Sequence, residues 1–237
     1  MPVGGLSLLS PITTPCRVVA QAVNYRSHAR ESGFGEEPPA VFFRKSSGSI
    51  SGPTDDIVRP AHVRLLDYEI ELGLVIRSGP TPGTAVPDAD LPDHIAGLVM
   101  CNDISARDVQ LTKGQFYESK SYPTFTPTGP RLVLLRGDEV TRLSGLRLRL
   151  WVNGQLRQDG TAADMITRPA AALSLLARFQ RLDPGATCSS PGRPAERPSS
   201  RRGRSSPRWG TCCRHRSSGG PSSPARNATP PTSRRAT

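Results

Sequence analysis

Apolar and polar residues alternate most clearly between positions 67 and 76. The apolar side chains recur at every second position, at Tyr68, Ile70, Leu72, Leu74 and Ile76. Such alternation predicts a β-strand with one apolar face. Glu69 and Glu71 share the opposite face, so the same strand carries an acidic pair into a surface or a site.

Other apolar runs predict further strands, at Val18–Tyr25, Ala40–Phe43, Ile95–Cys101, Leu132–Leu135 and Leu146–Val152. A polar turn and short helix are expected at Arg26–Gly33. The best amphipathic helix is predicted at Met165–Leu182, and a turn follows at Asp183–Gly185. Many strands with few helices indicate a β-rich α+β protein.

The apolar pattern stops at Gly185. Residues 186–237 contain no Leu, Ile, Val, Phe, Tyr or Met, so they have almost nothing with which to form a core. They also hold 11 arginines and a single acid, Glu196, which gives them +10 of the net charge of +11. We therefore expect one nearly neutral domain at 1–185 and a disordered Arg/Ser/Pro-rich tail at 186–237.

Charge and composition limit the classes of function. A charge of +11 would favour nucleic acid or an anionic membrane as partner, but the body of the chain does not carry it. No window approaches the roughly 18 apolar residues of a membrane span, and Met1–Ser10 does not look like a secretion signal. The five cysteines show no regular disulfide or zinc spacing. We expect a soluble protein of the reducing cytoplasm.

Two carboxylates at alternate strand positions point the same way, about 7 Å apart at the backbone. Glu69 and Glu71 can therefore converge on one cation, and Asp103, just after the run Ile95–Cys101, would add a third oxygen. Carboxylates favour Mg²⁺, Mn²⁺ or Ca²⁺ over zinc. The alternative, from spacing alone, is a solvated sheet face paired with arginines.

His28 and Glu31 stand three residues apart on the predicted turn-helix. A carboxylate there can fix the imidazole tautomer and raise its basicity, which gives a base for activating water. An ordinary surface pair is the alternative. Lys120 and Arg107 suit anionic oxygens, but each could equally be an exposed cation of a polar segment.

The motifs together resemble the fumarylacetoacetate hydrolase family in order and spacing. They are Asn24–Glu31, Asp67–Leu72, Asn102–Asp108, Lys120-Ser121, Pro127–Pro130 and Val152–Gln158. The resemblance extends from about Val18 to Gly185 and favours the short-chain acylpyruvate-cleaving branch. It implies mixed sheets rolled around a central site, usually in a homodimer.

The resemblance also implies roles for individual residues. The ligands of a Mg²⁺ or Mn²⁺ ion, with Ca²⁺ left open, would be Glu69, Glu71 and Asp103. The catalytic groups would be the dyad His28 and Glu31 together with Lys120, which stabilises an oxyanion. The substrate would contact Arg107, Tyr25 and Gln110.

The implied reaction is hydrolysis of a carbon–carbon bond in an acylpyruvate or related 2-keto or diketo acid, as in the breakdown of aromatic compounds. The ion would stabilise the enolate that forms on cleavage. Isomerisation, hydration and decarboxylation pass through the same enolate, so the ligand set does not choose among them. A different class of function is an inactive scaffold whose basic tail binds nucleic acid.

The tail itself has a further interpretation. Leu182–Gly185 begins the family motif L-x-P-G-D, which usually continues with an apolar strand and a T-G-T-P-x-G loop. Shifted by one base, the codons of residues 186–197 permit D-L-L-L-T-G-T-P-G-G-T. We interpret the tail as frame-shifted and the C-terminal strands of the rolled sheets as missing. Unpaired sheet edges and lost apolar surface should then leave the chain poorly stable and weakly active.

Overall fold

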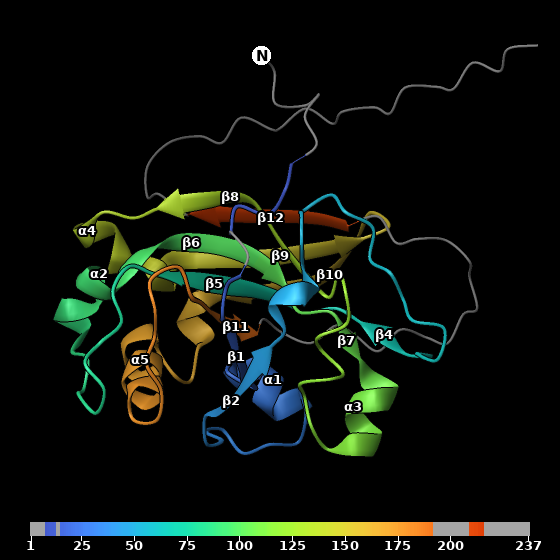
Figure 1. The fold of residues 1–237 in the computed structure, drawn as a ribbon, viewed down its shortest axis with the longest axis horizontal. Helices are drawn as coiled ribbons and strands as arrows, with labels where there is room; N and C mark the ends of the chain where they lie inside the picture. The colour runs from blue at the N-terminus through green and yellow to red at the C-terminus, as the bar shows by residue number, and fades with distance from the viewer. Residues whose placement is uncertain (1–7, 13–14, 192–208, 216–237) are drawn as a thin grey trace, which may run out of the picture.

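The computed structural model describes residues 8–12, 15–191 and 209–215 (Figure 1). The strands of its large sheet are β1 (Val18–Ala22), β2 (Val41–Lys45), β3 (Ile50–Ser51), β5 (Ile70–Ile76), β6 (Ile95–Asn102), β8 (Thr126–Leu134) and β11 (Thr187–Pro191). A three-stranded sheet contains β9 (Leu146–Val152), β10 (Gln155–Thr161) and β12 (Trp209–His215). A two-stranded sheet contains β4 (Leu66–Asp67) and β7 (Ser105–Ala106).

The large sheet has the order β2-β1-β11-β5-β6-β8-β3, and the three-stranded sheet has the order β10-β9-β12. The α-helices are short: α1 (Arg26–Glu31), α2 (Leu91–His94), α3 (Arg107–Lys113), α4 (Gly137–Val140) and α5 (Pro169–Ala177). Single 3₁₀ turns are η2 (Ser47–Ser49), η3 (Asp88–Asp90), η4 (Leu143–Gly145) and η5 (Ala162–Asp164). Several sheets with few helices confirm the predicted mixed α+β class. None of the helices in the described ranges is long and apolar enough to cross a membrane.

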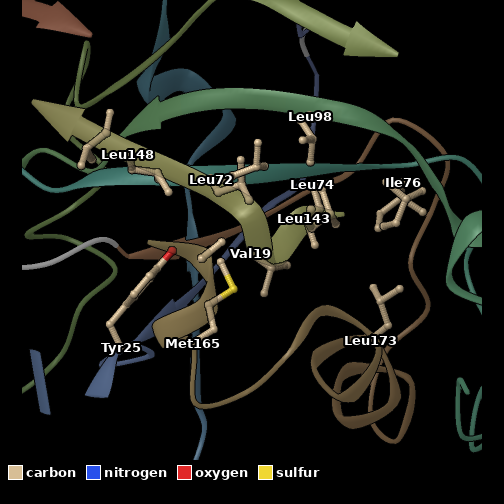
Figure 2. Packing of buried hydrophobic residues seen from close by; sticks show 14 of the residues in the cluster. Val19, Tyr25, Leu72, Leu74, Ile76, Leu98, Leu143, Leu148, Met165 and Leu173 are labelled. Carbon is tan, nitrogen blue, oxygen red and sulfur yellow. The ribbon is translucent and has the colours of Figure 1, made fainter. Parts of the chain in front are cut away.

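Strand β5 is buried on both faces. Leu72, Leu74 and Ile76 point into the larger apolar cluster, beside Leu148 of β9 and Leu173 of α5 (Figure 2). The opposite face packs in a second cluster, formed by Ile12, Cys16, Val18, Val75, Val99 and Cys101. The predicted separation of the two faces is therefore correct, and the acidic face is covered by protein.

Two predicted elements have different bounds. The helix expected at Met165–Leu182 is α5, which begins only at Pro169. Met165 is held outside it by an isolated bridge to Tyr25, and proline in the first helical turn loses no hydrogen bond. Strand β8 starts at Thr126, before the run predicted at Leu132, because its polar first half pairs with β3 and β6.

Two segments of the expected tail are strands. β11 lies between β1, to which it is parallel, and β5, to which it is antiparallel, and β12 pairs with β9. Gly185 donates its amide hydrogen to the carbonyl of Ile76 at 2.8 Å, and the amide of Ile76 donates to Ala186 at 2.9 Å. Backbone pairing needs no apolar side chains, so composition does not reveal it. Residues 192–208 and 216–237 lie outside the described residues.

Candidate functional site

The three predicted ligands meet where β5 begins and β6 ends. β5 and β6 are antiparallel neighbours, and the amide of Asp103 donates to the carbonyl of Glu69 at 2.7 Å. One carboxylate oxygen from each of Glu69, Glu71 and Asp103 lies within 4.8 Å of the others. Their exposed fractions are 4%, 0% and 1%, so this acidic cluster is not a solvated sheet face.

Buried cations surround the acidic cluster. Lys120 Nζ lies 2.7 Å from Glu69 Oε2 and 2.5 Å from Asp103 Oδ2. Arg107 contacts Glu69 Oε1, and Lys45 contacts Asp103 Oδ1. An unpaired buried carboxylate costs several kcal/mol of desolvation free energy, so these contacts are needed to keep the charges inside the fold. Lys120 is only 3% exposed, which removes the alternative of a lysine in a solvated loop.

The cations fix the charge of the cluster. Burial raises the pKa of Glu69, but Arg107 and Lys120 outweigh it and hold that pKa well below its usual range. Burial lowers the pKa of Lys120, but Asp103 and Glu69 outweigh it and raise that pKa. Near neutral pH Glu69 is therefore ionised and the ammonium group of Lys120 is charged.

Arg107, the first residue of α3, forms hydrogen bonds with three partners through its guanidinium group. Nε donates to Asp67 Oδ2 at 2.8 Å, Nη1 donates to Gln110 Oε1 at 2.7 Å, and Nη2 donates to Glu69. The structure thus brings Gln110 to Arg107, one helical turn along. The predicted substrate contact of Gln110 stays a prediction.

His28 lies on α1, half-buried, while Glu31 is exposed on the same helix. His28 Nδ1 and Ser32 Oγ share a hydrogen bond of 3.1 Å. Burial lowers the pKa of His28, although the charges of Glu69 and Glu31 oppose this effect. The imidazole is therefore neutral near pH 7 and able to accept a proton, and it lies within electrostatic reach of the acidic cluster.

Tyr25 is placed mainly by the core. It is 1% exposed and packs in the larger apolar cluster near Met165 (Figure 2). Its hydroxyl has no hydrogen-bond partner among the described residues. Burial raises the pKa of Tyr25, and the charges of Glu71 and Asp164 add to this effect. Its predicted contact with substrate also stays a prediction.

Sequence reasoning missed Lys45 as a member of the site. It ends β2, is 4% exposed, and donates to the carbonyl of Phe125 at 3.0 Å as well as contacting Asp103. Strand alternation separates it from its neighbour Arg44, which is exposed. The alternation along β2 indicates that Arg44 and Lys45 lie on opposite faces of the strand. It does not indicate which of the two faces is buried, because that depends on pairing with distant strands.

A cavity of about 200 Å³ adjoins the residues next to the cluster. Ile70, Cys101 and Asn102 line it together with the loop at residues 53–55 and the start of β8. A larger cavity, about 390 Å³, lies among Leu72, Leu98 and Leu143, and Met100 lines both cavities. Ile70 and Asn102, which line the smaller cavity, are sequence neighbours of the predicted ligands, although none of the three ligands lines it. The smaller cavity is therefore the better candidate for a small substrate.

The chain was compared with known proteins. The family model described as "Fumarylacetoacetate (FAA) hydrolase C-terminal" matches residues 17–189. "Oxaloacetate tautomerase fahd2, mitochondrial" of Xenopus laevis is 34% identical over 182 residues, which cover 76% of this chain and 56% of that protein. "Oxaloacetate tautomerase FAHD2A, mitochondrial" of Homo sapiens is 31% identical over 187 residues, covering 78% and 58%. The chain thus spans a little over half the length of these curated relatives.

Solved structures are similar as well. The 5-carboxymethyl-2-hydroxymuconate delta-isomerase from Mycobacterium smegmatis is 31% identical with a TM-score of 0.69, covering 83% of this chain and 74% of that one. A fumarylacetoacetate hydrolase from Exiguobacterium antarcticum is 31% identical with a TM-score of 0.67, covering 78% and 65%. The names of these relatives and structures are those of a tautomerase, an isomerase and a hydrolase.

Proposed function

Because this chain belongs to the fumarylacetoacetate hydrolase family, we propose that it is a metal-dependent enzyme acting on 2-keto or 1,3-diketo acids. The acidic cluster of Glu69, Glu71 and Asp103 carries the proposal. The first reaction to test is proton transfer beside the keto group, as in tautomerisation or double-bond isomerisation, since similar proteins bear those names. Hydrolysis of an acylpyruvate is the second candidate, favoured by the neutral His28 that can take a proton from water.

The donor set suits a hard divalent ion. All three groups are carboxylates, they converge from two adjacent strands, and they are buried. Oxygen donors of this kind favour Mg²⁺ or Mn²⁺ over zinc, which prefers His and Cys. When bound, such an ion supplies positive charge that polarises the keto oxygen of the substrate.

Arg107 is suited to hold a substrate carboxylate. A guanidinium has five N–H donors, and three of them serve Asp67, Glu69 and Gln110. Within the described part of the chain, one N–H on each Nη nitrogen is left over. Those two donors match the two oxygens of a carboxylate, and the three existing bonds hold the guanidinium still.

His28 and Lys120 would divide the proton transfer and the stabilisation of charge. A neutral His28 accepts a proton from carbon in an isomerisation or from water in a hydrolysis, and Glu31 stabilises the resulting imidazolium by its charge. Lys120 carries a positive charge beside the acidic cluster and would stabilise the oxyanion that develops on the substrate.

A substrate panel tests the proposal. The full chain, with and without Mg²⁺ or Mn²⁺, is assayed for interconversion of the keto and enol forms of oxaloacetate and for cleavage of acylpyruvates. Glu71→Gln, which keeps the side-chain shape, should reduce the metal-dependent rate by at least about 100-fold. The exposed Glu36→Gln is the matched control and should not change the rate. Full activity in Glu71→Gln would exclude the site.

A further inference from the structure

We propose that Lys45 is a positioning residue that orients Asp103 towards a bound divalent ion, whereas Lys120 makes contacts that such an ion replaces. The inference rests on the proposed metal-dependent function. It gives the two buried lysines of the site different tasks, although both contact the same aspartate.

Lys45 has a fixed set of partners. Its ammonium group contacts Asp103 Oδ1 and donates to the carbonyl of Phe125 at 3.0 Å. The side chains of Lys45 and Asp103 are each 1% exposed, so water does not compete for the contact. The carbonyl oxygen of Phe125 also accepts a hydrogen bond of 3.1 Å from the amide of Ile104, so both of its lone pairs are already engaged. Lys45 therefore keeps both partners when the remaining oxygen of Asp103 takes a new one.

Lys120 differs in the partners of its ammonium group. It contacts Glu69 Oε2 at 2.7 Å and Asp103 Oδ2 at 2.5 Å, both oxygens of the predicted ligands. A divalent ion held by Glu69 and Asp103 would compete with the ammonium group for these carboxylates. Lys120 would then be available to an anionic substrate oxygen, as the proposed function requires.

The backbone holds the two lysines next to each other. Lys45 ends β2, and the amide of the next residue, Ser46, donates to the hydroxyl of Ser121 at 3.0 Å. Ser121 directly follows Lys120. This hydrogen bond fixes the two segments relative to each other, so the ammonium groups approach Asp103 from set directions.

The two roles differ in the sign of their effect on metal affinity. Removing a positive charge near a cation site strengthens cation binding through Coulomb interaction alone. If Lys45 acts by positioning, its removal weakens binding instead, because Asp103 loses its orientation. Groups that orient a ligand typically change metal affinity by about 10- to 100-fold.

The test measures Mn²⁺ binding by isothermal titration calorimetry and electron paramagnetic resonance, without substrate. Lys45→Met should bind Mn²⁺ at least about tenfold more weakly than the wild-type chain. Lys45→Gln keeps a hydrogen-bond donor for Asp103 and should bind within about threefold of wild type, or more tightly. Lys120→Met should bind at least as tightly as wild type, since a competing cation has been removed.

The outcomes separate this inference from the function on which it rests. If the wild-type chain binds no Mn²⁺, the proposed metal-dependent function is wrong. If wild type binds and Lys45→Met binds equally or more tightly, only the positioning role is overturned. Circular dichroism checks that each variant is folded. If Lys45→Met does not fold, Lys45→Gln takes its place, and a tenfold weaker binding of Mn²⁺ by folded Lys45→Gln would overturn the positioning role.

Discussion

Gln158 accepts a hydrogen bond of 2.8 Å from the amide of Ile70, although 88 residues separate them in the chain. The bond joins β10 to the segment between Glu69 and Glu71, and Gln158 is 1% exposed. This gives the last residue of the Val152–Gln158 motif a structural role: it fixes the backbone that carries two of the predicted ligands.

Gln158→Leu should lower the free energy of unfolding by about 1–3 kcal/mol, because the amide of Ile70 loses its acceptor inside the core. Urea unfolding followed by circular dichroism measures the change. Gln155→Leu, at an exposed position of the same strand, is the control and should change stability much less. Equal effects of the two substitutions would remove the role given to Gln158.

Gly73 of β5 leaves no room for a side chain. A Cβ atom there would lie 2.8 Å from Val99 Cγ1 and 2.9 Å from Cys101 Sγ. Gly73→Ala should therefore destabilise the chain by about 1–3 kcal/mol through overpacking. Gly160→Ala in β10 meets nothing within 4 Å and serves as the control in thermal unfolding. A Gly73→Ala chain as stable as wild type would contradict this packing.

The pKa of His28 predicts a pH dependence. Because burial lowers that pKa, the contribution of His28 to stability is present above its unfolded value of about 6.5 and is lost as the pH falls through the lower, folded value. The same neutral imidazole is needed as a base, so the acid limb of the rate profile should lie below pH 6.5.

Glu31→Gln should move the His28 titration, followed by NMR, further down the pH scale, because the charge of Glu31 raises this pKa. Histidine-selective ¹³C labelling with His28→Gln as the assignment control isolates the signal. A midpoint that stays in place after Glu31→Gln would show that the two residues do not act as a pair.

Mn²⁺ should raise the melting temperature of the wild-type chain. A ligand at 100 times its Kd stabilises a folded protein by about 2.7 kcal/mol. Glu71→Gln should abolish most of the shift, since it removes a ligand charge, and the exposed Glu36→Gln should keep it. A shift of equal size in Glu71→Gln would place the binding of Mn²⁺ elsewhere.

We propose further that residues from 186 onward are read out of frame. A chain with the frame shifted at this point would contain the apolar strand and threonine loop described above. It should melt at a higher temperature and turn over keto acids faster than the chain as written, because it buries more apolar surface. Equal melting temperature and turnover in the two chains would refute the frame-shift interpretation.

Local patterns predicted much of the site. Alternation placed Glu69 and Glu71 on one face, and the end of an apolar run placed Asp103, because both features depend only on strand periodicity. The burial of Lys45 was not predictable in the same way, since it depends on which strands pair with β2. The burial of Tyr25 likewise follows from its packing and its bridge to Met165, which lies 140 positions away.

The strands that the sequence patterns did not predict are likewise those that form through pairing with strands distant in the chain. β11 has the polar sequence T-C-S-S-P, and nothing in its composition indicates a strand. It forms because β1 and β5 offer backbone donors and acceptors on either side. The homodimer and the cytoplasmic location stay predictions from the sequence.

The position of β11 has a consequence for the order of assembly during synthesis. β1 and β2, with Lys45, lie on one side of it, and β5 and β6, with Asp103, lie on the other. Ribosomes make the chain from the N-terminus, so both halves of the sheet emerge before the strand that joins them. Before β11 is made, the segment of Lys45 is joined to the segment of Asp103 only through contacts such as the pairing of β3 with β8 and the hydrogen bond from Ser46 to Ser121. The facing edges of β1 and β5 are unpaired at that stage, and open strand edges favour wrong pairing.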